Sequence, residues 1–321
     1  MKIQSKIAIL LLVASSFANA QFVKKHGQLK VKATELVDKN DKHVSLRGMS
    51  FGWHSFWPRF YNQNAVKWLK KDFKCNVVRA AMGIEVGDST YLQYPDFAKQ
   101  KIRAVIDGAI KQDIYVIVDW HSHNINLEEA KVFFAEISKE YGKYPNVLYE
   151  VFNEPDYETW PEIKAYSEEI IKVIRANDPD NIILVGCPHW DQDINLPAAD
   201  PIKGYHNLMY TMHFYAATHG KSLRDRTDEA IQSGLPVFIS ESAGMEATGD
   251  GPLNYVAWQE YIDWMEAKGL SWITWSVSDK DESCSILNKS ASSKGKWKDK
   301  DLKESGLKVR EYFRKYNTEK L

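Results

Sequence analysis

Short apolar runs alternate with longer segments of helical periodicity along most of the chain. Continuous apolar runs of this length are typical of strands buried on both faces. They lie at residues 45–51, 76–82, 114–118, 146–155, 181–185, 208–212, 236–241 and 272–275. Segments that predict helices lie at residues 65–69, 95–111, 127–141, 162–176, 223–233, 255–268 and 302–313. Only the connection at 191–203 lacks clear helical periodicity. This order predicts parallel strands joined by crossover helices.

The number of strand–helix units distinguishes two α/β architectures. About eight units are present, which is the number that a (β/α)8 TIM barrel requires. A doubly wound open sheet would carry a glycine-rich turn after its first strand, and Gly48 and Gly52 do not have that spacing. No low-complexity linker divides the chain, and the polar segment 290–301 is typical of a long surface loop. The sequence therefore predicts one barrel domain over residues 21–321.

A hairpin is expected before the first barrel strand. Leu29-Lys30-Val31 and His43-Val44-Ser45-Leu46 flank a turn-rich segment at residues 38–41. We expect this N-terminal β-hairpin to cap the bottom of the barrel.

The first twenty residues have the pattern of a secretory signal peptide. Lys2 and Lys6 precede an apolar run at residues 7–13, and Ala18-Asn19-Ala20 supplies a cleavage site. The run is too short to span a bilayer. We expect cleavage after Ala20 and a secreted or periplasmic protein. A buried N-terminal helix is the alternative.

Composition narrows the range of partners. The formal net charge is −1, so nothing favours nucleic acid or an anionic membrane as a partner. Cys75, Cys187 and Cys284 allow at most one intrachain disulfide, which excludes a disulfide scaffold. The 11 tryptophans are the unusual feature, because many of them lie beside predicted strand ends. We expect a monomer.

Two of the apolar runs end in a carboxylate. Residues 146–155 end in Asn153-Glu154-Pro155, and Pro155 removes a backbone donor from the ladder. In an extended strand, Glu150 and Glu154 would point to one face. Residues 236–241 end in Glu241. Because a buried charge is costly, two such carboxylates indicate a paired acid and nucleophile.

The other strand ends are rich in polar and aromatic residues, where a barrel places its catalytic groups. These residues are Trp53, His54, Trp57, Arg79, Trp120, His121, His123, Asn153, Glu154, His189, Trp190, His213, Tyr215, His219, Glu241 and Trp275. Exposed Trp faces offer apolar platforms for sugar rings. Arg79 lies within an apolar strand, so it should pair with a carboxylate, Glu150 or Glu241. Pairing with Glu241 would keep that group ionised.

Two other chemistries are less well supported. His121 and His123 would lie on one side of an extended strand end and supply two metal ligands. Neither a Cys cluster nor an HExxH motif accompanies them, so we expect no metal and no cofactor. A serine nucleophile is disfavoured because the chain has no G-x-S-x-G.

The motifs at the strand ends resemble those of glycoside hydrolase family 5. Val151-Phe152-Asn153-Glu154-Pro155 is similar to the acid/base motif of this family of (β/α)8 retaining glycosidases. Leu46-Arg47-Gly48-Met49-Ser50, Val78-Arg79, Asp119-Trp120-His121, Met212-His213-Phe214-Tyr215 and Ser240-Glu241 resemble its first, second, third, sixth and seventh strands. The segment from Trp275 to Ser283 resembles the bacterial endoglucanase subfamily. The first loop, residues 51–61, departs from the commonest form of the family.

The resemblance implies a role for each of these residues. Glu154 would be the general acid/base and Glu241 the nucleophile, so Glu154 should be protonated near neutral pH while Glu241 is ionised. Asn153 would bind the sugar 2-hydroxyl, and His213 and Tyr215 would hydrogen-bond at the reaction centre. The implied substrate contacts are His121, Trp275, Lys280 and Glu282, together with Trp53 or Trp57.

The predicted function is therefore a secreted, retaining endo-β-1,4-glucanase that acts on cellulose or mixed-linkage β-glucan. A β-mannanase or xylanase on the same barrel is the nearest alternative, because fold and acid pair do not determine the sugar. A non-catalytic glycan-binding protein is the alternative from another class. Turnover of barley glucan or carboxymethyl cellulose separates these possibilities.

Overall fold

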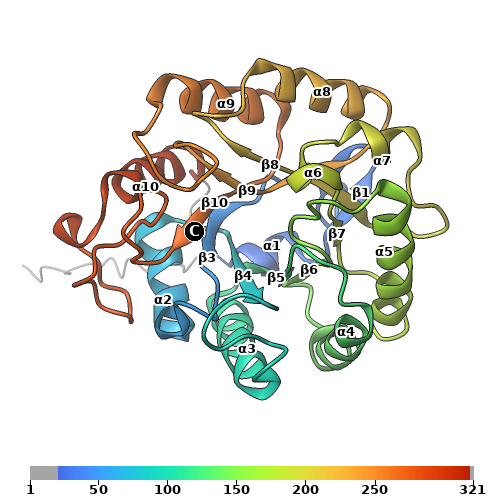
Figure 1. The fold of residues 1–321 in the computed structure, drawn as a ribbon, viewed down its shortest axis with the longest axis horizontal. Coiled ribbons are helices and arrows are strands. Elements are labelled where there is room, and N and C mark those ends of the chain that lie inside the picture. Colours follow the sequence, from blue (N-terminus) through green and yellow to red (C-terminus); the bar gives the residue numbers. More distant parts are fainter. Residues whose placement is uncertain (1–20, 319–321) are drawn as a thin grey trace, which may run out of the picture.

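Eight parallel strands form a closed barrel at the centre of the molecule, with helices around it (Figure 1). The structure is a computed structural model that describes residues 21–318, so the expected signal peptide lies outside the described residues. The barrel strands are β3 (Arg47–Phe51), β4 (Val77–Gly83), β5 (Tyr115–His121), β6 (Val147–Glu150), β7 (Ile183–Val185), β8 (Leu208–Tyr215), β9 (Val237–Ala243) and β10 (Trp272–Val277). They follow chain order around the barrel, and β10 closes it against β3. The predicted (β/α)8 barrel is confirmed.

The outer helices occupy most of the predicted segments. They are α2 (Gln63–Trp68, continued by a π-helical turn at Leu69–Phe73), α3 (Pro95–Gln112), α4 (Leu127–Tyr141), α5 (Trp160–Arg175), α8 (Lys221–Gln232), α9 (Tyr255–Lys268) and α10 (Glu304–Tyr316). α5 begins with a capping box between Thr159 and Glu162 and buries Ile163, Ile170 and Ile174. The segment without periodicity forms only α6 (Pro188–Asp191) and α7 (Asn195–Ala199).

Alternation along each strand separates the barrel interior from the helix-facing surface. On β5, Tyr115 and Ile117 pack inside the barrel, whereas Val116 and Val118 pack toward the helices. Trp120 belongs to the second set and lies against Phe133 and Phe134 of α4. The expectation that Trp120 reaches the barrel mouth is therefore wrong, because it is one residue out of phase with Asp119 and His121.

The N-terminal hairpin is present, but its second strand is not the predicted one. β1 (Lys30–Lys32) pairs with β2 (Glu35–Val37) around a tight turn at Ala33, whose φ is 53°. Residues 43–46 contribute only a bridge from His43 to Val37. Leu29 and Leu36 pack on the same cluster as Ile117 and the other lower interior residues, so the hairpin does cap the bottom of the barrel.

Strand β6 ends earlier than the sequence suggests. It ends at Glu150, and Glu154 lies in the irregular segment that follows. Leu148 and Glu150 share the interior face, but Phe152 turns outward against Tyr166. The expected common face of Glu150 and Glu154 in one strand is wrong. Glu154 is positioned instead by hydrogen bonds of the following loop, such as its N–H to Ser122 O at 3.3 Å.

Two further features concern the described residues as a whole. Cys75, Cys187 and Cys284 are all buried and free, so no disulfide joins them. No helix within residues 21–318 combines the length and the apolar character needed to cross a membrane.

Candidate active site

A cleft of about 810 Å³ opens over the carboxyl ends of the barrel strands. Its lining includes Trp53, Trp57, His121, Glu154, His213, Tyr215, Glu241, Trp275, Lys280 and Glu282. The remaining two residues predicted for the site, Arg79 and Asn153, are fully buried and contact each other, and Arg79 also contacts Glu241. Parallel strands bring their carboxyl ends to one rim of a barrel. The structure therefore gathers these twelve residues in one place.

Glu154 and Glu241 face each other at the centre of this cleft. One carboxylate oxygen from each lies within 4.8 Å of the other and of a ring nitrogen of His213. Glu241 and His213 are register partners on the adjacent strands β9 and β8. One oxygen of each carboxylate thus lies close enough for both groups to act on one sugar, as in the closer of the two arrangements found in glycosidases, whose carboxyl groups are about 5–5.5 Å apart.

Arg79 is the fully buried cation beneath the pair. Its Nε donates to Glu150 Oε2 at 2.7 Å, and its Nη1 donates to Glu241 Oε2 at 3.1 Å. Its Nη2 lies 3.0 Å from Asp119 Oδ2. Both predicted partners of Arg79 are confirmed, and Asp119 is a third that the sequence argument missed. Burial alone would lower the pKa of Arg79, but the three carboxylates raise it well above its usual value.

Asn153 lies beside this cation with its amide orientation set. Its Oδ1 accepts from Arg79 Nη2 at 2.5 Å. Its Nδ2 is buried and has no hydrogen-bond partner among the described residues. Buried amide donors are usually satisfied, so this group has the chemistry to donate to a substrate hydroxyl.

The two central carboxylates differ in their surroundings. The Tyr215 hydroxyl donates to Glu241 Oε1 at 2.7 Å, and Arg79 holds the other oxygen. Burial and then the negative charge of Glu154 nevertheless raise the pKa of Glu241. Burial also disfavours ionisation of Glu154, but His213, with Nδ1 2.8 Å from Glu154 Oε1, outweighs it and lowers the pKa of Glu154.

In the protein without substrate, the pKa of Glu154 is lowered and that of Glu241 is raised, which is the reverse of what the sequence predicts. The sequence predicts Glu150 or Glu241 as the partner of Arg79, an ionised Glu241 and a protonated Glu154. In the structure Arg79 is shared with Glu150 and Asp119, so its charge does not serve Glu241 alone. His213 was expected at the reaction centre, but its contact with Glu154 at 2.8 Å, which lowers the pKa of Glu154, was not predicted. The proton expected on Glu154 therefore lies in the pair that Glu154 forms with His213.

Aromatic rings form one wall of the cleft. Trp275 stacks on His121 with ring centroids 5.1 Å apart and planes 3° from parallel. Trp53 meets the same imidazole edge-on at 4.3 Å. His121 Nδ1 lies 2.7 Å from Asp119 Oδ2, which fixes the ring and leaves Nε2 for other partners. Lys280 and Glu282 form an ion pair that also lines the cleft.

Other rim residues have different positions. His54 is buried and its Nδ1 accepts from Gly83 N at 2.9 Å, so its role is structural. His123, His189, Trp190 and His219 line the cleft as the sequence pattern suggested. Asp191 and Ser240 contact His213 but were not predicted. Asp119 could have been found by the reasoning that selected Arg79, because it too interrupts an apolar strand.

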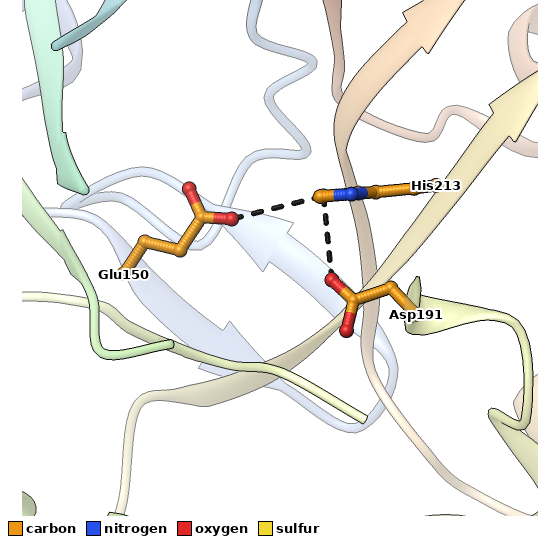
Figure 2. Close-up of side chains that lie close together, drawn as sticks. All are labelled: Glu150, Asp191 and His213. Atoms are coloured by element: carbon orange, nitrogen blue, oxygen red, sulfur yellow. Dashed lines mark ion pairs between the residues drawn. The ribbon is translucent and has the colours of Figure 1, made fainter. Parts of the chain in front are cut away.

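Within residues 21–318, two groups of side chains bring together metal-ligand atom types. One contains Glu150, Asp191 and His213 (Figure 2), and the other contains Glu154, His213 and Glu241. Their atoms already have partners: His213 Nε2 lies 2.8 Å from Ser240 Oγ, and Glu150 binds Arg79 through both oxygens. Because Arg79 supplies the positive charge here, the donor set fits a hydrogen-bond network better than a metal site. His121 and His123 bond to Asp119 and to the backbone of Glu154, and belong to neither group.

A barrel whose mouth carries a carboxylate pair between aromatic walls has the architecture of a glycoside hydrolase. Comparison with known proteins defines the family. Residues 37–281 match the family described as Cellulase (glycosyl hydrolase family 5), and the chain belongs to that family.

Named relatives and solved structures agree with this assignment. The chain is 41% identical over 299 residues to an endoglucanase of Clostridium saccharobutylicum, covering 91% of this chain and 66% of that protein. It is 44% identical over 279 residues to endoglucanase A of Evansella cellulosilytica, covering 84% of this chain and 56% of that one. The chain thus spans less than two thirds of the length of these relatives.

Two solved structures have the same fold along nearly their whole length. A Cytophaga hutchinsonii structure is 41% identical with a TM-score of 0.91, covering 93% of this chain and 98% of the other. The catalytic domain of a Thermobifida fusca endoglucanase, solved with cellotetraose, is 33% identical with a TM-score of 0.86. That alignment covers 92% of this chain and 100% of the domain.

Proposed function

We propose that the protein is an endo-β-1,4-glucanase that hydrolyses cellulose or mixed-linkage β-glucan with retention of anomeric configuration. The observation that carries the proposal is the Glu154–Glu241 pair, whose nearest oxygens lie within 4.8 Å at the centre of the cleft. That spacing suits direct attack by one carboxylate on the sugar.

In the first chemical step, Glu154 delivers a proton to the glycosidic oxygen as the bond from that oxygen to the anomeric carbon breaks. A Glu241 oxygen forms a bond to the same carbon, giving a covalent glycosyl-enzyme. Tyr215 and Arg79 bind the Glu241 carboxylate and orient it for this attack. In the second step, water loses a proton to Glu154, attacks the anomeric carbon and releases Glu241.

The remaining cleft residues have roles in binding. Asn153 Nδ2 is the donor for the sugar 2-hydroxyl, and the Trp275 ring, held against His121, is the platform for a sugar face. Trp53 and Trp57 both line the cleft, so both are candidates for further sugar contacts. The relatives from Clostridium saccharobutylicum, Evansella cellulosilytica and Pectobacterium carotovorum are endoglucanases, which supports a β-1,4-glucan over another sugar.

A substrate panel tests the assignment. The purified protein should release reducing ends from barley β-glucan and carboxymethyl cellulose, with a rapid fall in viscosity that indicates internal cleavage. Turnover confined to mannan or xylan would instead identify a mannanase or a xylanase. Binding without turnover would favour a glycan-binding protein. A 2-fluoro-cellobioside with a good leaving group should label Glu241, as peptide mass spectrometry would show. Labelling at another residue would contradict the proposed mechanism.

We also propose that the protein is exported and acts as a monomer. The support for export is the charged, apolar and small-residue order of residues 1–20. N-terminal sequencing of protein recovered from the culture medium or periplasm should begin at Gln21. Intact Met1 on protein that stays in the cytoplasm would contradict export, and a dimer mass in light scattering would contradict the monomer.

A further inference from the structure

We propose that Asp191 is a positioning residue for the proposed hydrolysis: it fixes the proton on one nitrogen of His213 and so sets the proton supply of Glu154. The inference rests on the proposed function of Glu154 as the acid. It starts from the fully buried carboxylate of Asp191, whose Oδ2 lies 3.3 Å from His213 Nε2 (Figure 2). Asp191 faces the side of the imidazole opposite Glu154, so it acts through His213.

The hydrogen bonds around His213 determine which nitrogen carries a proton. The Ser240 hydroxyl donates its hydrogen to Glu150 Oε1 at 2.7 Å. In its 2.8 Å contact with His213 Nε2, Ser240 Oγ must therefore accept, and Nε2 must donate. Asp191 Oδ2 at 3.3 Å and Glu150 Oε1 at 3.8 Å add two carboxylates on the same side of the ring. One hydrogen-bond acceptor and two nearby carboxylates keep the proton on Nε2.

This leaves Nδ1 to share a proton with Glu154. The two atoms lie 2.8 Å apart. With Nε2 already protonated, one further proton lies between them, either as imidazolium and carboxylate or as imidazole and carboxylic acid. Loss of that proton deprives the glycosidic oxygen of its acid. The alkaline limb of the pH–rate profile therefore reports this His213–Glu154 pair.

The backbone around Asp191 adopts an unfavourable left-handed conformation. His189, Trp190 and Asp191 have φ values of 59°, 53° and 58°, so three consecutive residues other than glycine adopt the left-handed region. Such residues persist only where surrounding contacts support them. The Cys187 N–H donates to Asp191 Oδ1 at 2.6 Å, and the Thr211 hydroxyl donates to Oδ2. Burial raises the pKa of Asp191 well above its usual value, and His213 and these two donors oppose that shift by favouring the ionised form.

The charge of Asp191 acts on His213 together with several neighbours. The charged and titratable groups around the imidazole are Glu150, Glu154, Asp191, Glu241, Asp119, Arg79, His121 and His219. Burial lowers the pKa of His213, but Asp191, Glu150 and Glu154 raise it well above its usual value. Removing the negative charge of Asp191 destabilises the protonated His213–Glu154 pair, so the pair must lose its proton at lower pH.

The test is the pH profile of kcat/KM for Asp191→Asn on carboxymethyl cellulose and on an aryl cellobioside. The variant keeps the side-chain volume and an oxygen for the Cys187 N–H. We expect its alkaline limb to move down by about one to three pH units, the usual effect of one nearby charge. The control is Asp193→Asn on the same segment, which removes an equal charge that pairs with Arg226 and lies 3.8 Å from His189, but makes no contact with His213. Its limb should stay within about 0.3 units of the wild type.

A purely structural Asp191 would lower stability and rate without moving the limb, and that result would overturn the proposal. NMR of histidine-labelled protein gives a second readout that needs no activity. The His213 imidazolium, assigned by its loss in His213→Asn, should persist to higher pH in the wild type than in Asp191→Asn. Equal titration in the two proteins would also overturn the proposal. Wild-type protein that hydrolyses none of the substrates would instead refute the proposed function, and the NMR comparison would still test Asp191.

Discussion

Replacing Arg79 with methionine should lower the free energy of unfolding, because the site depends on one buried cation. The guanidinium is fully buried and lies within 3.1 Å of oxygens from Glu150, Asp119 and Glu241. Methionine fills part of the volume but leaves these carboxylates without their counter-charge. Breaking a buried ion pair by removing one partner typically costs about 3–5 kcal/mol.

The pKa of Glu150 gives a second estimate of how much this buried ion-pair network stabilises the fold. Burial would raise this pKa, but Arg79 and then His213 hold it at about 2 in the folded protein. An ordinary glutamate titrates near 4.3, and one pKa unit corresponds to about 1.4 kcal/mol, so this group alone contributes about 3 kcal/mol. Because the folded pKa is depressed, the contribution is fully present above the unfolded value and is lost as pH falls toward 2.

Urea unfolding followed by tryptophan fluorescence provides the assay. At pH 7, Arg79→Met should lose about 3–5 kcal/mol of unfolding free energy. The difference from the wild type should shrink as pH falls from 4.5 to 3, as far as both proteins stay folded. Arg103→Met is the control, since Arg103 pairs with Glu136 and Glu140 at the surface and should cost less than about 1 kcal/mol. An Arg79→Met cost as small as this control, or one independent of pH, would refute the reasoning.

Three further predictions concern substrate binding, the nucleophile and metal dependence. Trp275→Ala should lower kcat/KM by about tenfold or more. The control, Trp272→Ala, removes a fully buried ring packed on Phe313, so it should cost about 3–5 kcal/mol of stability with little change in kinetics per folded molecule. The opposite pattern would make Trp275 a core residue. Tyr215→Phe removes a hydrogen bond that lowers the pKa of Glu241, so the acid limb of the rate profile should move to higher pH, and an unmoved limb would contradict that contact. Dialysis against a strong chelator should leave activity unchanged, and a loss that Zn²⁺ or Mn²⁺ restores would assign the histidines a metal.

Much of the site could be predicted because a barrel converts sequence position into spatial position. Each apolar run ends at the same rim, so Glu154, Glu241 and Arg79 could be placed together without knowing any contact. The predicted positions were wrong where neighbouring residues of a strand point to opposite faces of the sheet. Trp120 lies beside Asp119 and His121 in the sequence but faces the helices. The predicted hairpin pairing was wrong because the chain turns at Ala33 and Thr34, directly after Lys32, and not in the polar segment 38–41.

The charge distribution could not be predicted from strand order. Asp191 lies in a short irregular helix with left-handed residues, and the hydrophobic periodicity of the sequence does not predict such a helix. Its contact with His213 depends on the packing of α6 against β8 across the chain. Likewise, burial and the charge of Glu154 raise the pKa of Glu241 while His213 lowers the pKa of Glu154, which reverses the expected order of the two values. Such shifts depend on distances of a few ångström, which spacing along a sequence does not determine.

The most direct test of the central claim is the anomeric configuration of the first product. Proton NMR during rapid hydrolysis of a cello-oligosaccharide distinguishes the two anomers before mutarotation. A carboxylate pair whose nearest oxygens lie within 4.8 Å predicts double displacement, so the β-anomer should appear first. Initial formation of the α-anomer would mean inversion by a water molecule, and it would contradict the role proposed for Glu241.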